Sequence, residues 1–153
     1  MVTSPQDWVI DFSKAGADRF TFHIESQQES TRELCLTIKQ YGMQCGIALK
    51  PGTAIEGVYE FVDAGLVDLV LIMMVEPGFG GQKMLISCIP KIEALRKRYP
   101  SLDIQVDGGI DVQNVDLVAR AGANVIVSGT GIFGHADPHR AITEMSAIVG
   151  SYL

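Results

Sequence analysis

The sequence has little of what marks a nucleic-acid-binding, membrane-spanning or disulfide-rich protein. Its 12 Lys and Arg stand against 18 Asp and Glu, and a formal net charge of −6 gives no electrostatic support for binding nucleic acid or an anionic membrane. No apolar run approaches the length of a membrane span, and no basic stretch leads into an apolar one at the start. We therefore expect a cytoplasmic protein that binds neither nucleic acid nor membrane.

Cysteine is scarce as well. Cys35, Cys45 and Cys88 show no metal-type spacing, and their odd number argues against a disulfide framework. Cys35 lies in a helical pattern and Cys45 opens an apolar stretch, so both are expected to be reduced thiols of the core.

Linkers are also missing, because no Pro-rich or Ser-rich stretch divides the 153 residues. An apolar share of 47% is ample for a core of this size, and 20% charged residues with 16 glycines is typical of a soluble α/β protein. We expect residues 1–153 to form a single domain.

What the chain does contain is an alternation of strand and helix patterns. Strict alternation predicts parallel strands with right-handed crossovers. Five apolar stretches are continuous, as in strands covered on both faces: 20–25, 45–49, 68–75, 103–107 and 124–128. Helical patterns lie near 5–16, 29–41, 54–64, 87–99, 111–121 and 136–152. An Ala-Gly repeat at 15–18, 64–68 and 121–124 closes three of these helices, where glycine suits the left-handed ending position.

Two architectures fit this order, a doubly wound open sheet and a (β/α)8 barrel. Glycines follow three successive strands, at 78–81, 108–109 and 129, which favours a barrel, since its sites are built from several such loops. A doubly wound sheet would concentrate its glycines at one switch point. A barrel usually needs about 250 residues, and this chain opens on a helix. We expect an incomplete TIM (β/α)8 barrel with about five parallel strands and six helices.

The glycine loops are candidates for binding an anion. Bare backbone N–H groups in Gly78–Gly81, Gly108-Gly109 and Ser128-Gly129-Thr130 could close around anionic oxygens, although each loop alone could simply serve a tight turn. Asp107 ends its strand directly before two glycines. It could accept hydrogen bonds from the turn, or act as a general acid or base or as a metal ligand.

Other polar residues at strand ends carry weaker signals. His23, with Glu25 two residues on, is more often a satisfied core or rim residue than a catalytic one. Lys50 opens another loop at a strand end and could neutralise charge in a site or be exposed.

At these motifs the chain resembles ribulose-phosphate 3-epimerase of the pentose phosphate pathway. The resemblance covers essentially the whole chain, and the matching stretches are Phe20–His23, Leu49–Thr53, Val75–Lys83, Pro100–Gly109 and Ala121–Gly129. It implies an isomerase that interconverts D-ribulose 5-phosphate and D-xylulose 5-phosphate through an enediolate. Two aspartates would act on opposite faces of the third carbon. A divalent metal (Zn, Fe, Mn or similar), held by these aspartates and two histidines, would stabilise the intermediate.

The resemblance also assigns roles to residues of this chain. Asp107 would be the second aspartate, both catalytic and a metal ligand, and Met73 and Met1 would belong to a sulfur-lined cap over the substrate. The substrate, chiefly its phosphate, would be held by Gly78, Phe79, Gly80, Gly81, Asp107, Gly108, Gly109, Gly129 and Thr130.

The departures from the family concern the missing half of the catalytic centre. The family's first serine contact, its His-x-Asp strand and its next ligand histidine all match positions upstream of Met1. We therefore expect the last five-eighths or so of the barrel, with phosphate recognition largely encoded, most metal ligands absent and little or no turnover by the isolated chain. Exposed strand edges would favour association, including a homo-oligomer. Smaller departures are Met74 and Thr130, where threonine and serine are usual, and Met84-Leu85 after the glycine loop.

Three alternatives remain open. The chain could be a shortened isoform or incomplete gene model of an active enzyme. It could be a non-catalytic binding or interaction protein of the same family. It could also be another barrel enzyme that acts on a sugar phosphate. Such enzymes have similar phosphate-binding loops but lack the sequence of residues 76–82.

Overall fold

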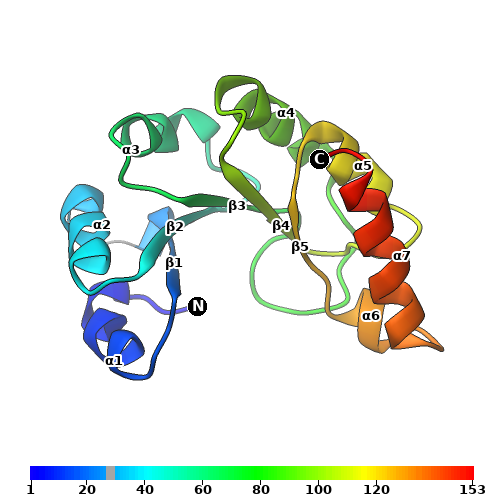
Figure 1. Ribbon diagram of the computed structural model, residues 1–153, viewed down its shortest axis with the longest axis horizontal. Helices are drawn as coiled ribbons and strands as arrows, with labels where there is room; N and C mark the ends of the chain where they lie inside the picture. The colour runs from blue at the N-terminus through cyan, green and yellow to red at the C-terminus, as the bar shows by residue number, and fades with distance from the viewer. Residues whose placement is uncertain (27–29) are drawn as a thin grey trace. The chain divides into compact units, whose positions relative to one another are not determined.

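The five expected strands form one sheet. The computed structural model describes residues 1–26 and 30–153 (Figure 1). The strands follow one another in the order β1-β2-β3-β4-β5, with bounds Arg19–His23, Gln44–Leu49, Leu69–Met73, Asp103–Asp107 and Val125–Val127. The pairs β1/β2 and β4/β5 are parallel, with Arg19 opposite Gln44 and Gln105 opposite Val125. Consecutive strands are therefore sheet neighbours, as a run of βα units requires.

Helices lie in all six regions where they were expected. The α-helices are α1 Val9–Lys14, α2 Thr31–Gln40, α3 Tyr59–Asp63, α4 Ile89–Arg98, α5 Val115–Ala121, α6 Thr130–Phe133 and α7 Pro138–Gly150. Short 3-10 helices η1 Pro5–Trp8, η3 Ile55–Val58 and η4 Ile86–Cys88 precede three of them. Two elements were not expected, α6 and the 3-10 turn η2 Ile24–Ser26, which ends β1 two residues early. The expected start of the second helix, residue 29, lies outside the described residues.

The fifth helix begins later than the sequence suggested. Residues 111–114 form a turn in which Asn114 Oδ1 accepts from the Asp111 amide at 3.0 Å and Asp111 Oδ1 accepts from the Gln113 amide at 2.9 Å. Short Asp and Asn side chains compete with helical hydrogen bonds in this way. The helix expected from 111 therefore starts at Val115.

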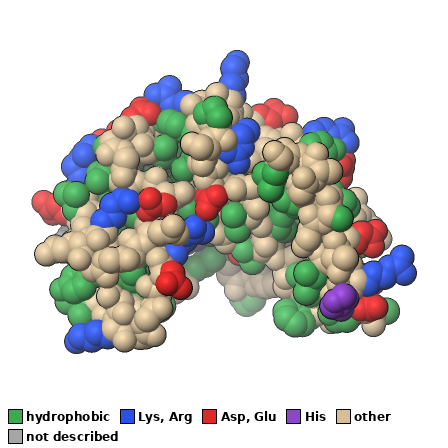
Figure 2. Space-filling view, viewed as in Figure 1, with side chains coloured by type: hydrophobic (Ala, Val, Ile, Leu, Met, Phe, Trp, Pro, Cys, Tyr) green, Lys and Arg blue, Asp and Glu red, His purple; other side chains and the backbone are tan. Residues whose placement is uncertain are grey.

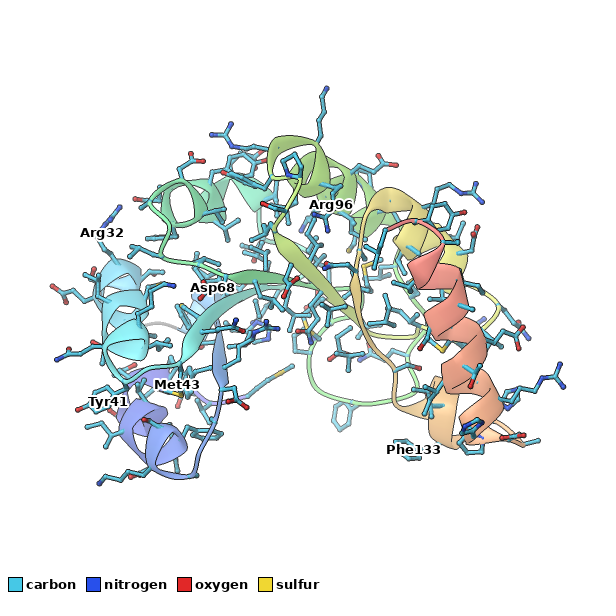
Figure 3. All side chains as sticks on the ribbon, in the orientation of Figure 1. Arg32, Tyr41, Met43, Asp68, Arg96 and Phe133 are labelled. Atoms are coloured by element: carbon cyan, nitrogen blue, oxygen red, sulfur yellow. The ribbon has the colours of Figure 1, made fainter. Side chains whose placement is uncertain are left out.

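The chain divides into two compact units, Met1–Leu71 and Ile72–Leu153. In the first unit α2 packs on β2. Asp68, labelled in Figure 3, accepts from Lys39 Nζ at 3.0 Å and from the Cys45 amide at 2.7 Å. Cys35 and Cys45 are buried free thiols, as expected. The single-domain prediction stays a prediction.

In the second unit α4 contacts α5, and α5 contacts α7, so these helices lie in a row (Figure 1). Arg96 of α4, labelled in Figure 3, links α4 to the segments that follow α4 and α5. Its guanidinium donates to the carbonyl oxygens of Gly122 at 2.8 and 2.9 Å, Pro100 at 2.7 Å and Leu102 at 2.9 Å. A charged fork that satisfies several main-chain carbonyls at once fixes the turns that end α4 and α5.

The Ala-Gly repeat ends its helices as the sequence indicated. Gly16, Gly65 and Gly122 have φ of 87°, 67° and 112°, a region that other residues reach only with strain. On the face shown in Figure 2, Lys and Arg side chains are dispersed among acidic and uncharged ones. Over residues 1–26 and 30–153, no helix is both long enough and apolar enough to cross a bilayer.

Candidate anion-binding site

The glycine loops of the second unit meet around one pocket. Gly81, Gly109 and Thr130, one from each loop that was expected to bind an anion, line a cavity of about 410 Å³. Gln82, Lys83, Met84, Ile86, Ile110, Asp111, Asn114, Leu117 and Gly131 complete the lining. Gly78, Phe79, Gly80, Gly108 and Gly129 belong to the same loops, but they do not line this cavity.

The first loop follows β3 and is closed by a side chain. Gln82 Nε2 donates to the carbonyl oxygens of Glu76 at 2.8 Å and Phe79 at 2.9 Å, which holds the glycine turn in shape. Gly78 and Gly81 have φ of 152° and 76°. Phe79 at the loop tip is 87% exposed, so its ring contributes little packing to the unit. The sequence analysis identified these glycines but did not predict that the side-chain amide of Gln82 would hold the loop in shape.

The second loop is packed so tightly that only glycine fits. A Cβ on Gly109, where φ is 66°, would lie 2.6 Å from the Gln82 carbonyl oxygen. A Cβ on Gly108, where φ is 122°, would lie 2.5 Å from a methyl group of Val75. The first and second loops therefore touch through their backbones. Asn114 Nδ2 donates to the Gly109 carbonyl oxygen at 2.9 Å and orients that peptide group.

The third loop leads from β5 into α6. Ser128 Oγ donates to the Ile110 carbonyl oxygen at 2.6 Å, which ties this loop to the second one. Gly129 precedes the helix and is open to solvent, and Thr130 is the first residue of α6. The sequence analysis named the loop of Ser128 but assigned no role to Lys83 or Asn114, because nothing in the spacing of these two residues marks them. They become visible only when the loops are brought together.

Asp107 ends β4 immediately before the second loop and is half-buried. Its carbonyl oxygen accepts from the Met74 amide at 2.7 Å, so the backbone is fixed beside the end of β3. Burial raises the pKa of the Asp107 carboxyl. A carboxyl with a raised pKa at the end of a parallel strand is suited to exchange protons with a ligand.

The two methionines that were expected to form a cap over the substrate differ in burial. Met73, at the end of β3, is buried at 3% exposure, and Met1, in the first unit, is 80% exposed. Their role over a substrate stays a prediction.

The described residues do not by themselves make a divalent-metal site. Over residues 1–26 and 30–153, no group of three or more His, Cys, Asp and Glu side chains is arranged to hold a metal ion. One carboxylate, Asp107, falls short of the several oxygen or nitrogen ligands that such ions take.

Comparison with known proteins identifies relatives over most of the chain. Residues 1–133 match the model of the ribulose-phosphate 3 epimerase family. A cytoplasmic isoform of ribulose-phosphate 3-epimerase from Oryza sativa subsp. japonica is 51% identical over 146 residues, covering 95% of this chain and 64% of the relative. Ribulose-phosphate 3-epimerase of Candida glabrata is 48% identical, covering 95% of this chain and 58% of the relative. The chain thus spans about three-fifths of the length of these curated relatives.

Solved structures support the fold that was expected. A 3-hexulose-6-phosphate synthase from Salmonella typhimurium is similar with a TM-score of 0.73 at 20% identity, over 98% of this chain and 70% of that protein. A protein titled KGPDC from Streptococcus mutans gives a TM-score of 0.72 at 14% identity, over 97% and 68%. At such low identity these likenesses bear on the fold alone. They confirm the TIM-barrel family as the fold class.

Proposed function

This chain belongs to the ribulose-phosphate 3-epimerase family, and we propose that its second unit carries phosphate recognition and one acid/base group for interconverting D-ribulose 5-phosphate and D-xylulose 5-phosphate. The observation that carries the proposal is the meeting of Gly81, Gly109 and Thr130 around one pocket in the unit that also holds Asp107. Backbone N–H groups in such loops suit an anionic phosphate. The global charge of −6 does not oppose this, because the donors act locally.

Asp107 supplies one half of the proton chemistry in this proposal. As a carboxylate it takes the proton from the third carbon of one epimer, and the electron pair of that C–H bond moves into the adjacent carbonyl to give an enediolate. As a carboxylic acid it returns a proton to the same face. Burial raises the pKa of Asp107, which makes the acid form easier to reach than for an exposed aspartate.

Inversion requires a second group on the opposite face, because one carboxyl cannot reach both sides of a planar enediolate. Among the described residues no carboxylate cluster accompanies Asp107. We therefore propose that the 153-residue polypeptide alone binds the pentulose phosphate and turns it over slowly or not at all. The alternative is a non-catalytic interaction protein of the same family, which would bind neither epimer.

Calorimetric titration separates these two functions. D-ribulose 5-phosphate and inorganic phosphate should both bind the purified chain, whereas unphosphorylated D-ribulose should bind much more weakly. The reason is that hydrogen bonds to a charged acceptor contribute about 1.5–3 kcal/mol each. Equal binding of D-ribulose with and without its phosphate, or no binding of either, would contradict phosphate recognition.

An epimerase assay tests the catalytic half. The chain and its Asp107→Asn variant, both freed of host epimerase, are incubated with D-ribulose 5-phosphate and added divalent metal. We expect the two to form D-xylulose 5-phosphate equally slowly. Formation that disappears with Asp107→Asn would show that the polypeptide is a complete enzyme.

Homo-oligomer formation and a cytoplasmic location belong to the same proposal. Light scattering and cell fractionation test them. One relative is named a cytoplasmic isoform.

A further inference from the structure

The second unit contains another groove, which lies between β5 and α7 (Figure 1). Its volume is about 340 Å³, and the described residues that line it have no ionisable side chain. Alternate residues in and beside the strand, which share one face of it, form one wall: Asn124, Ile126 and Ser128. The rest of the lining is Ile132 of α6, Leu153, and Ile142, Met145, Ser146, Val149 and Gly150 of α7.

Helix α7 presents an exposed stripe along this groove. Ile142, Ser146 and Gly150 are spaced four residues apart, so they lie one above the other on one face of the helix. All three are exposed, and half of the Ile142 surface is open to solvent. Met145 and Val149, each one residue before a member of the stripe, are buried. The stripe is therefore a face of α7 that the described residues leave uncovered.

The ion pair of α7 lies on another side of the helix. Arg140 Nε and Glu144 Oε2 are 3.9 Å apart, and both side chains are well exposed. Each residue is two positions from Ile142, which is about 200° around a helix of 3.6 residues per turn. The stripe is thus an uncharged face on a chain whose formal net charge is −6.

The stripe is complementary to itself in shape. If a second α7 runs antiparallel to the first about a two-fold axis at Ser146, position 142 of each copy faces position 150 of the other. Ile142, the largest side chain of the stripe, then meets Gly150, which has none. The space beside Gly150 is open, because a Cβ added there would meet no atom within 4 Å. A two-fold interface requires a patch that fits itself in this way.

We propose that α7 packs antiparallel against α7 of a second copy of this chain, with Ile142 of each copy over Gly150 of the other. Charge selects this occupant. Two copies that each carry a net charge of −6 repel one another over most approaches, whereas the stripe brings no ionisable side chain into the contact.

The area of the stripe predicts a weak, reversible dimer. A helix of 13 residues is about 20 Å long and about 10 Å wide, so its footprint is roughly 200 Å². A standard interface buries roughly 800 Å² per partner. The contact also does not depend on phosphate recognition, because Gly81, Gly109 and Thr130 do not line this groove.

An intermolecular nuclear Overhauser experiment tests the arrangement on the wild-type chain. Carbon-13-labelled and unlabelled chains are mixed at high concentration, and contacts between unlike copies are selected. We expect a contact from the Ile142 methyl groups of one copy to Gly150 of the other. Within one copy the two residues are about 12 Å apart along the helix, too far to give this signal. Intermolecular contacts that involve only other residues would contradict the proposal.

Two matched substitutions test the surface by sedimentation equilibrium. Ser146→Glu places a carboxylate of each copy at the two-fold axis, so the dimer Kd should rise at least about ten-fold. Ala147→Glu adds the same charge at the next residue of α7, which is exposed but does not line the groove. It should leave the Kd within about two-fold of the wild-type value. Equal effects of the two variants would show general repulsion and contradict a contact at Ser146.

Mixing opposite charges tests the two-fold axis itself. Ser146→Lys should weaken self-association as Ser146→Glu does, because like charges again meet. An equimolar mixture of the two variants should associate at least about ten-fold more tightly than either variant alone. This rescue occurs only if position 146 of one copy faces position 146 of the other, so its absence would overturn the antiparallel arrangement.

The remaining outcomes separate this proposal from the proposed function. A wild-type chain that stays monomeric at every concentration would refute the dimer. A dimer that Ser146→Glu leaves intact would mean that the copies meet elsewhere. Phosphate that fails to bind a wild-type dimer would contradict the proposed function and leave the α7 contact standing. If Ser146→Glu does not fold, the wild-type Overhauser contact still decides.

Discussion

Replacing Gly109 with alanine probes the contact between the first two glycine loops. Alanine at φ 66° costs about 1–2 kcal/mol, because its Cβ crowds its own backbone there. The same Cβ would lie 2.6 Å from the Gln82 carbonyl oxygen and 2.9 Å from the Lys83 carbonyl carbon. These are backbone atoms and cannot rotate away, so repacking adds about 1–3 kcal/mol. The free energy of unfolding should therefore fall by about 2–5 kcal/mol.

Urea denaturation followed by circular dichroism measures this loss. With a slope of about 2 kcal/mol per molar, the middle of the usual range, the midpoint should fall by roughly 1–2.5 M for Gly109→Ala. Gly129→Ala is the matched control, since its φ is −93° and no atom lies within 4 Å of the added Cβ. It should stay within about 0.5 kcal/mol of the wild type. A Gly109→Ala midpoint equal to that of the control would refute the packing argument.

Two further substitutions test the second unit. Arg96→Lys should lower the free energy of unfolding by about 2–4 kcal/mol. The reason is that one ammonium cannot satisfy the carbonyls of Gly122, Pro100 and Leu102 together. The control, Arg140→Lys on exposed α7, should change the free energy of unfolding by less than about 0.5 kcal/mol. Equal melting curves for the two variants would contradict this. Asp107→Asn should stabilise the chain at pH 7, by less than about 1 kcal/mol at this half-exposed position, because burial disfavours the carboxylate. This advantage should vanish near pH 3, below the usual aspartate pKa of about 3.9, where the wild-type carboxyl is also neutral. An advantage that grows toward acid pH would show that the carboxylate is stabilised instead.

The sequence predicted the elements of the fold well, because continuous apolar strands and glycine-terminated helices are local signals. Gly16, Gly65 and Gly122 end helices with positive φ where the Ala-Gly repeat indicated. The prediction was wrong at 111–114, where the side chains of Asp111 and Asn114 compete with helical hydrogen bonds and delay the helix. The short α6 was missed because four residues are too few for a periodic pattern.

The candidate site could be predicted only in part. Motif spacing identified Gly81, Gly109 and Thr130, which do line one pocket. Motif spacing could not show that the Gln82 side chain stabilises its loop, since the hydrogen bonds of that side chain depend on how the loop folds. It also could not reveal that Glu25 reaches the loop after β2, a contact between residues 25 positions apart. Such long-range pairings exist only once the sheet has formed.

Mapping the phosphate by NMR tests the central claim most directly. Inorganic phosphate is titrated into the nitrogen-15-labelled chain while all backbone amide signals are followed. The account predicts saturable shifts of the amides of Gly81, Gly109 and Thr130, with no shift at Gly16 or Gly42 in the first unit. Saturable shifts confined to other residues, or no shift at all, would contradict the claim that these glycine loops bind the phosphate.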